Sequence, residues 1–312
     1  MFVTVLCVCF ITFAIAMKPD KVTSPIKNLE SSLAASAAKS TVIAVKNSPM
    51  DCVILLCTSD ARTRSKLTVS PTPSEIIQIS GIHLNRYEDD TFLSHSSRWS
   101  LLSPTCFSIM TGFSPDVSHL TKVAAKLSAS HEALQSQALP IFKLVRSMSS
   151  LLQRETQREG ARPYGIQALW IGWDSPQRKD LQLYTCDPTG LHRHIPGGIA
   201  VIGRRSVEDI RPIIMESMLE VDTDSESEST LTTFQHCLKA MLRCSENNWL
   251  PSISELKKKS SMDDYDIAAH WEGIFLHKSP TTGDLEANAI NADFLRQVFR
   301  EVVSNLEDIS EA

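Results

Sequence analysis

The stretch Ala161–Gly190, ARPYGIQALWIGWDSPQRKDLQLYTCDPTG, contains the pattern that decides the fold. Its two apolar runs, Ile166–Trp173 and Leu181–Cys186, are short and contain β-branched and aromatic residues, which is typical of strands. The tetrapeptide Asp187–Gly190 has Asp first, Pro second and Gly fourth, the residues that a type I turn prefers. The stretch therefore predicts two strands, the second of which ends in a tight turn.

Two helical patterns precede this stretch. Side chains from Val117 to Leu134, and again from Ile141 to Leu152, place apolar residues with a period of about 3.6 residues, so each pattern gives one apolar stripe. Pro140 stands at the start of the second pattern, where its missing N–H would be unpaired in any helix. These patterns predict two long helices, joined by a short link, that pack antiparallel on a sheet.

Further elements extend the pattern in both directions. Strands are predicted at Thr41–Val45, Cys52–Cys57, Ile76–Ile79, Phe107–Met110, Ile199–Ile202 and Ile274–Leu276, and helices at Leu29–Ala38, Leu231–Cys244 and Ala292–Leu306. Blocks of strands that alternate with helix pairs fit antiparallel sheets covered on both outer faces by helices, rather than the βαβ rhythm of a parallel sheet. The expected fold class is α+β, a four-layer αββα sandwich of two antiparallel sheets in one domain.

The N-terminal residues 1–28 are expected to form an apolar stretch and a tail outside this domain. Met1–Ala16 is almost unbroken in its apolar character and carries no charge. It is short for a membrane span of about 20 residues, and it has the length of a signal-peptide core without the basic segment that normally precedes one. It is either an unusual targeting peptide or the product of a wrongly assigned start.

The domain is expected to span residues 29–312 and to contain two irregular segments. Residues 81–105 are polar and lack a clear period, which indicates an insertion. Residues 222–230 are acidic and serine-rich, which indicates an exposed linker. Within this linker Thr223 and Ser225 each have a glutamate three residues on, so they are candidate phosphorylation sites beside the simpler interpretation of a solvated linker.

Composition excludes some classes of function. The net charge is −5 with both signs interspersed, whereas nucleic-acid binders usually show a strong basic bias. The eight cysteines form no CxxC pair and no dense framework, and most lie among aliphatic residues. We therefore expect reduced thiols that act as small apolar side chains, instead of a disulfide framework.

Two local features allow alternative interpretations. His192 and His194 could belong to a metal site, but a fourth ligand at suitable spacing is missing, so a surface hairpin that carries two histidines is the simpler hypothesis. Trp170 and Trp173 could form a platform for a ligand. We expect them to be packing residues in a strand.

Three short motifs, in this order along the chain, resemble those of proteasome subunits, which have the N-terminal-nucleophile hydrolase fold. Met110-Thr111-Gly112 is similar to an element that precedes the first long helix in that family. Arg162-Pro163-Tyr164-Gly165, followed by a strand that ends in Gly172-Trp173-Asp174, is similar to the RP[FLY]G segment of alpha subunits and its strand ending in G-x-D. Leu181–Gly190 is similar to the PQLYxxDPxG strand and turn. Together these motifs indicate a member of the proteasome alpha type.

The resemblance implies a function as well as a fold. Alpha subunits carry a short helix ahead of their first strand, which Leu29–Ala38 resembles, whereas catalytic beta subunits begin the mature chain at a threonine. The chain is thus expected to be a non-catalytic subunit of the 20S core particle, in the cytoplasm and nucleus. Its implied partners are other alpha and beta subunits and the regulatory particle or activators, with no nucleic acid and no membrane. It would contribute to ring assembly, pore gating and regulator docking in ubiquitin-dependent protein degradation, without a cofactor.

The residues expected at a catalytic site do not fit a threonine peptidase. Thr41 starts the first strand, as the nucleophile would, but Lys39 and Ser40 precede it where self-cleavage needs glycine. The segment that supplies the family's lysine is matched to residues 74–79, with Glu75 or Ile76 at that position. The same missing lysine implies weak docking of activator tails and a similarity to the alpha-type 6 class.

Two other hypotheses remain open at this point. In the first, the chain is an active threonine-type hydrolase whose mature form begins at Thr41. In the second, it is a secreted or membrane-anchored binding protein, cleaved after Ala16 and carrying oxidised cysteine pairs. No catalytic, cofactor-binding or metal-binding residue is assigned in the preferred interpretation.

Overall fold

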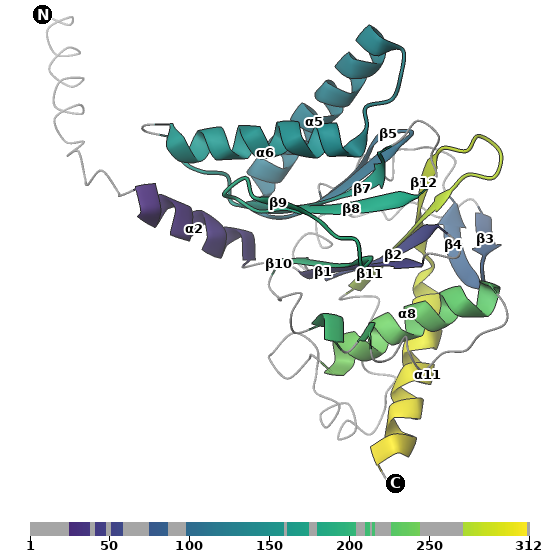
Figure 1. The fold of residues 1–312 in the computed structure, drawn as a ribbon. Coiled ribbons are helices and arrows are strands. Elements are labelled where there is room, and N and C mark those ends of the chain that lie inside the picture. The colour runs from purple at the N-terminus through teal and green to yellow at the C-terminus, as the bar shows by residue number, and fades with distance from the viewer. Residues whose placement is uncertain are drawn as a thin grey trace, which may run out of the picture.

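The computed structural model has four layers, helices–sheet–sheet–helices (Figure 1). It describes residues 25–37, 41–47, 51–58, 75–86, 98–158, 161–174, 180–203, 210–212, 214–215, 226–243 and 271–310. The predicted α+β sandwich of two antiparallel sheets is confirmed. The described residues also confirm the order of strands and helix pairs that the sequence predicts.

One sheet has seven strands in the order β10-β1-β2-β11-β12-β4-β3, with every pair antiparallel. Its strands are β1 (Thr41–Asn47), β2 (Cys52–Thr58), β3 (Glu75–Ile79), β4 (Ile82–Arg86), β10 (Ile199–Gly203), β11 (Trp271–Lys278) and β12 (Leu285–Ile290). The central strands are buried on both faces, which explains why their sequences are nearly continuous apolar runs.

The other sheet has five strands in the order β5-β6-β7-β8-β9. Its strands are β5 (Trp99–Ser103), β6 (Cys106–Gly112), β7 (Ile166–Trp173), β8 (Leu181–Cys186) and β9 (His192–His194). The stretch that decides the fold therefore provides the central strand β7 and its neighbour β8, which pair antiparallel from Trp173 opposite Leu181 to Ala168 opposite Cys186.

Two helix pairs cover the outer faces. The helices α5 (Ser114–Gln135) and α6 (Ile141–Gln157) lie on the five-stranded sheet, whereas α8 (Glu226–Arg243) and α11 (Ala292–Ser310) lie on the seven-stranded one (Figure 1). Three apolar cores result: one between each helix pair and its sheet, and one between the two sheets. Such a stack buries every apolar face that the strand and helix patterns create.

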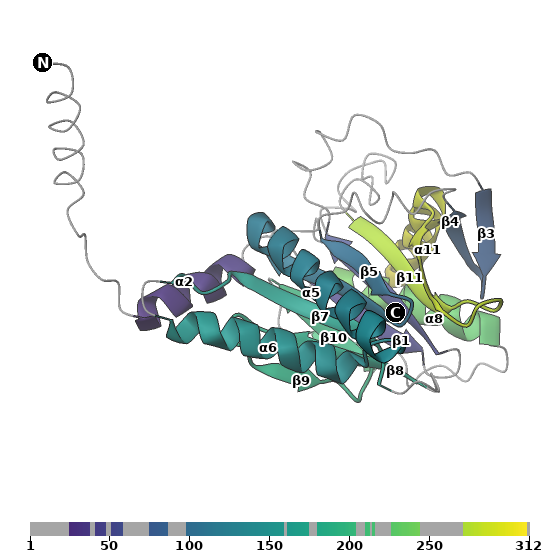
Figure 2. The ribbon, with the colours of Figure 1, turned by 90° about the horizontal axis from the view of Figure 1, so that it is seen from above.

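A further helix, α2 (Pro25–Ala37), precedes the first strand and lies at one end of the sandwich. Both views place it at the end opposite the β3–β4 hairpin (Figures 1 and 2). It contacts β6 and β7 of one sheet and β10 of the other. The predicted helix over Leu29–Ala38 is thus present, but it begins at Pro25, inside the range assigned to the tail, since proline is well tolerated in the first turn of a helix. Residues 1–24, which include the Met1–Ala16 run, lie outside the described residues.

The prediction of an insertion without structure at residues 81–105 was wrong for the part that the structure describes. Strand β4 and strand β5 both lie in this range. In β4 the buried Ile82 and Leu84 alternate with His83 and Asn85, which is the period of a half-buried strand over too few residues to stand out. Residues 87–97 lie outside the described residues.

The prediction of an exposed acidic linker at residues 222–230 was wrong for its second half. Helix α8 begins at Glu226, and Thr230, within this helix, is fully buried. Acidic side chains are favourable in the first turn of a helix because they face the positive end of its dipole, so a serine- and glutamate-rich segment can start a helix as well as form a linker. Residues 222–225, with Thr223 and Ser225, lie outside the described residues.

Candidate functional site

Thr41, the candidate nucleophile, starts β1 and is only 2% exposed. It pairs with Gly203 at the end of β10, and the next residue, Val42, pairs with Cys57 of β2. Helix α2 precedes Thr41 in the chain and packs on the same end of the sandwich. Thr41 therefore lies within a sheet, beside the strand β10 that α2 contacts.

The segment that was matched to the family's lysine does not lie near Thr41. Glu75 and Ile76 belong to β3, at the outer edge of the seven-stranded sheet, whereas β1 is the second strand from the opposite edge. The assignment of the lysine position to these residues was therefore wrong. It failed because β5, which lies nearer to the start of β1, was hidden in the range assigned to an insertion.

The cation that the structure brings close to the start of β1 is Arg98. Its backbone carbonyl accepts a hydrogen bond from the Met110 N–H at 2.8 Å, which places it just ahead of β5. Burial raises the pKa of the neighbouring Cys57 thiol, the charge of Glu272 raises it further, and the charge of Arg98 lowers it. The sequence signal that could have found Arg98 was its place immediately before a short apolar run.

Arg98 and Glu272 lie near the start of β1, whereas a threonine peptidase has a lysine near its nucleophile. Glu272 pairs with Cys57 across β11 and β2, so Arg98 and Glu272 bring opposite charges to the same buried thiol. Such a pair balances charge at the end of the sheet.

Helix α2 is held by hydrogen bonds to strand β7 and to the loop that precedes it. The Ser32 hydroxyl donates to the carbonyl of Pro163 at 3.0 Å. The side-chain amide of Gln167, in β7, donates to the Ser36 hydroxyl at 3.4 Å, while its oxygen accepts the Gly203 N–H at 2.7 Å. Gln167 thus connects α2, the five-stranded sheet and the end of the seven-stranded sheet.

The Arg162–Gly165 motif forms the surface on which α2 lies. Asp116, buried in the first turn of α5, accepts hydrogen bonds from the Arg162 guanidinium at 2.6 Å and from the Gly165 N–H at 2.9 Å. The same guanidinium lies over the ring of Phe113, 5.2 Å from its centre. The motif therefore forms a fixed loop that contacts both α2 and α5.

The end of the strand that follows Arg162–Gly165 and the Leu181–Gly190 motif fix α6 to the same sheet. Asp174 accepts hydrogen bonds from the Phe142 N–H at the start of α6, at 2.9 Å, and from the Tyr184 hydroxyl at 2.6 Å. The Ser149 hydroxyl, in the middle of α6, donates to the carbonyl of Gly190, which ends the predicted type I turn. The Arg162–Asp174 and Leu181–Gly190 motifs are therefore structural joints between helices and the five-stranded sheet.

The two histidines of the metal hypothesis lie on the short edge strand β9. His192 is hydrogen-bonded through Nδ1 to the Ser149 hydroxyl at 2.9 Å, and His194 through Nε2 to the Gln182 side chain at 2.6 Å. Within the described ranges, no group of three or more His, Cys, Asp or Glu side chains is placed to hold a metal ion. The histidines therefore stand on a surface hairpin, as the simpler hypothesis predicted.

The cysteines that the structure describes are free and buried: Cys52, Cys57, Cys106, Cys186 and Cys237. Burial raises the pKa of the Cys52 and Cys237 thiols to about 12. A thiol with such a pKa is protonated at neutral pH and is a poor nucleophile. For these five residues the prediction of reduced, structural cysteines is confirmed, while Cys7, Cys9 and Cys244 lie outside the described residues.

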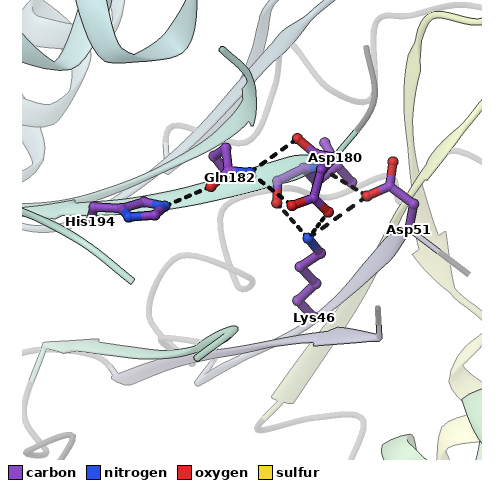
Figure 3. Close-up of polar contacts among 6 residues, drawn as sticks. Lys46, Asp51, Asp180, Gln182 and His194 are labelled. Carbon is purple, nitrogen blue, oxygen red and sulfur yellow. Dashed lines mark hydrogen bonds and ion pairs between the residues drawn. The ribbon is translucent and has the colours of Figure 1, made fainter. Parts of the chain in front are cut away.

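A buried lysine connects the two sheets at the other end of β1. The Lys46 ammonium pairs with Asp180, donates to the carbonyl of Leu181 at 2.8 Å and lies 4.0 Å from Asp51 (Figure 3). Asp51 also accepts the Leu181 N–H at 2.8 Å. The lysine side chain is only 9% exposed, whereas the Asp180 side chain is 57% exposed.

We expect Lys46→Met to lower the free energy of unfolding by about 1–2 kcal/mol, because the buried carbonyl of Leu181 loses a charged donor while the apolar stem is kept. Asp180→Asn should cost about 0.5 kcal/mol or less, since its exposed carboxylate is largely solvated. Urea denaturation of both variants tests this order. An equal or larger loss in Asp180→Asn would show that the exposed ion pair, and not the buried contact to Leu181, connects the sheets.

Sequence comparisons agree with this geometry. The model of the family described as "Proteasome subunit" matches residues 83–250, more than half of the chain. The chain is 33% identical over 84 residues to proteasome subunit alpha type-2 of Caenorhabditis elegans, which covers 27% of this chain and 36% of that protein. It is 28% identical over 109 residues to proteasome subunit alpha type-2 of Drosophila melanogaster, which covers 35% of this chain and 45% of that protein. The match thus spans less than half the length of these relatives.

The names of these two relatives test the expected similarity to the alpha-type 6 class. Both relatives are alpha type-2 proteins, so they do not confirm the similarity to the alpha-type 6 class. That similarity also rested on the lysine segment that the structure places elsewhere. Among the described residues, no helix combines the length and the apolar character that crossing a bilayer requires. The four-layer fold, the three motifs and the family match agree, and the chain belongs to the proteasome subunit family, with relatives of its alpha type.

Proposed function

We propose that this chain is a non-catalytic alpha-type subunit of the 20S proteasome core particle. It would join related alpha subunits in a ring that stacks on a ring of beta subunits, and it would contribute to pore gating and to the docking of regulators in ubiquitin-dependent protein degradation. The cytoplasm and the nucleus are the expected locations. No cofactor is part of the proposal.

One observation carries this proposal: α2 precedes β1 and packs over the end of the sandwich where Thr41 starts the strand. An N-terminal nucleophile needs a free amine and access to substrate. Thr41 is buried in the sheet and continues from a helix whose residues Ser32 and Ser36 are hydrogen-bonded to the core. The helix ahead of the first strand is also the feature in which alpha subunits differ from catalytic ones.

Exposed apolar side chains on α2 and α5 support a place in an assembly. On α2, Ile26 is 69% and Leu33 37% exposed, and their separation of seven residues puts them on one face of the helix. On α5, Leu127 is 37% and Leu134 81% exposed with the same separation. Exposed apolar stripes on a folded chain mark contact surfaces, and we assign these two to neighbouring subunits.

The expectation of weak regulator docking loses its basis, because it depended on the absence of a lysine from residues 74–79. That segment forms an edge strand far from β1, and Arg98 provides a cation beside the start of β1 instead. Docking of regulators therefore stays part of the proposed function, and we no longer expect it to be weak.

Affinity purification of the full-length chain from its own cells, followed by mass spectrometry, tests the proposal. We expect proteasome alpha and beta subunits in the purified material and a first residue ahead of Thr41. Thr41→Ala should leave peptide hydrolysis by the complex unchanged. Recovery of the chain alone, or a mature N-terminus at Thr41, would contradict the proposed function.

The double variant Ile26→Asp/Leu134→Asp should reduce recovery of the other subunits by about tenfold or more, because each exposed apolar contact would be replaced by a desolvated charge. Ile76→Asp is a matched control: Ile76 is also exposed, at 56%, but it lies on β3 at the opposite end from α2. Equal losses in both variants would place the assembly surface elsewhere.

A further inference from the structure

The packing of α2 is unusual for a helix that covers a core. The side chains that it buries fully, Ser32 and Ser36, are small and polar; of its large apolar residues only Leu29 is partly buried, whereas Ile26 and Leu33 face outward. A helix normally gains its stability in a protein from a buried apolar face, and a free helix of this length is marginal in water. The attachment of α2 therefore depends on a few polar contacts and on close backbone approach.

Those contacts converge on the loop before β7. Ser32 donates to the carbonyl of Pro163, and an alanine Cβ built at Gly165 would lie 3.2 Å from the Cβ of Ala35. A side chain at residue 165 would therefore press on Ala35, and the helix would have to move away from the loop by a few tenths of an ångström.

Asp116, in the first turn of α5, determines the conformation of the loop at residues 162–165. It is a buried carboxylate that accepts both the Gly165 N–H and the Arg162 guanidinium, so the residues on either side of Pro163 are fixed by one side chain. The Arg162 guanidinium itself is half exposed and also lies over Phe113. Without Asp116, the Gly165 N–H would lose its acceptor and the guanidinium would turn to water.

We propose that α2 is a strap with a docked and a released position. Asp116 is the positioning residue that holds the loop at residues 162–165 in the conformation on which α2 docks. The released helix loses the Ser32–Pro163 and Ser36–Gln167 hydrogen bonds together, because both belong to the same face. A partner that contacts Ile26 and Leu33 in the docked position would shift the equilibrium toward that position. The shift is as large as the difference in the partner's affinity for the docked and the released positions.

Release would also change the end of β1. Gln167 donates to Ser36 and accepts the Gly203 N–H, and Gly203 pairs with Thr41. Loss of α2 leaves Gln167 with one partner and removes the cover from this end of the sandwich. The position of the strap therefore determines whether Gln167 bridges α2 to the Gly203–Thr41 pair, which is a property of the chain itself and does not rest on ring membership.

Hydrogen–deuterium exchange on the full-length chain tests the proposal through Asp116→Asn and Gly165→Ala. The first variant keeps the volume of the side chain but cannot accept both hydrogen bonds, and the second adds a methyl group against Ala35. In each variant, amide exchange over Pro25–Ala37 should be about tenfold faster than in the unaltered chain. The substitution lowers the free energy of opening α2, and amides of a locally opened helix exchange at a rate set by that free energy. Exchange in β7 and α8 should stay unchanged.

Asp174→Asn is the matched control, because Asp174 is also a carboxylate at a helix N-terminus that accepts one backbone N–H and one side-chain donor. It should speed exchange at the start of α6 and leave α2 unaffected. The proposal is overturned if α2 stays protected in both Asp116→Asn and Gly165→Ala, or if Asp174→Asn releases α2 to the same extent. Should Asp116→Asn fail to fold, Gly165→Ala alone decides, since it retains the Asp116 contacts.

Discussion

Gly172→Ala is expected to lower the free energy of unfolding by about 3 kcal/mol or more, because overpacking against backbone atoms cannot be relieved by a side-chain movement. An added Cβ at Gly172 would collide with the carbonyl of Thr105 and lie 3.2 Å from the Cα of Cys106, its partner in β6. It would also lie 3.1 Å from the Ile141 side chain at the start of α6. The G-x-D motif therefore requires glycine so that α6 and β6 can both approach β7.

Gly197→Ala is the control for this experiment. The nearest atoms to a Cβ at Gly197 belong to the Arg211 guanidinium, the far end of a flexible side chain that can move away. We expect a change within about 1 kcal/mol, since alanine also reduces the entropy of the unfolded chain. Urea denaturation followed by circular dichroism gives both values. A Gly172→Ala variant as stable as Gly197→Ala would mean that β6 and β7 can separate without cost.

The parts of the fold that were predictable from the sequence are those in which neighbours in the chain determine the structure. Strand β7 is a nearly continuous apolar run, and its alternate residues point into different cores. Trp170 packs beneath α5 and α6, whereas Trp173 packs between the sheets. A run of this kind indicates a strand with two buried faces even without its partners. The prediction that both tryptophans are packing residues is thus confirmed.

Short elements within polar surroundings were not predictable in the same way. Strand β4 has five residues and gains its stability from α11 and β12, as shown by the Asn291 side chain, which donates to Asn85 at 2.9 Å across 206 positions of the chain. Strand β5 is also short, and its apolar side chains are divided between two cores: Trp99 packs between the sheets and Leu102 packs beneath the helices α5 and α6. No local pattern contains such contacts, so both strands were assigned to an insertion.

The error in the candidate site follows from the same cause. Once β5 was missed, the nearest apolar segment ahead of β6 was Ile76–Ile79, and the lysine position was matched to it. The structure places that segment at the outer edge of the other sheet and brings Arg98 to the position beside Cys57. Spatial neighbours in a two-sheet sandwich depend on strand order, which residue spacing alone does not determine.

Trp170→Ala is expected to lower the free energy of unfolding by about 3–5 kcal/mol, the usual cost of removing a buried tryptophan and leaving a cavity. Trp170 is 1% exposed and belongs to the core between the five-stranded sheet and the pair α5 and α6. Since α5, α6 and α2 all contact this sheet, loss of the side chain should weaken the whole helical layer. Denaturant unfolding monitored by circular dichroism measures the loss.

Trp170→Phe separates the two components of this cost. The indole N–H of Trp170 and the hydroxyl of Ser108, which lies opposite it in β6, have no hydrogen-bond partner within the part of the chain that the structure describes. Phenylalanine loses some volume but also removes an unsatisfied buried donor, so the net loss should be about 1 kcal/mol or less. If Trp170→Phe cost as much as Trp170→Ala, the indole N–H would have to be stabilising the core. The tryptophan would then act through its polar group, and its volume would not account for the stability of the helical layer.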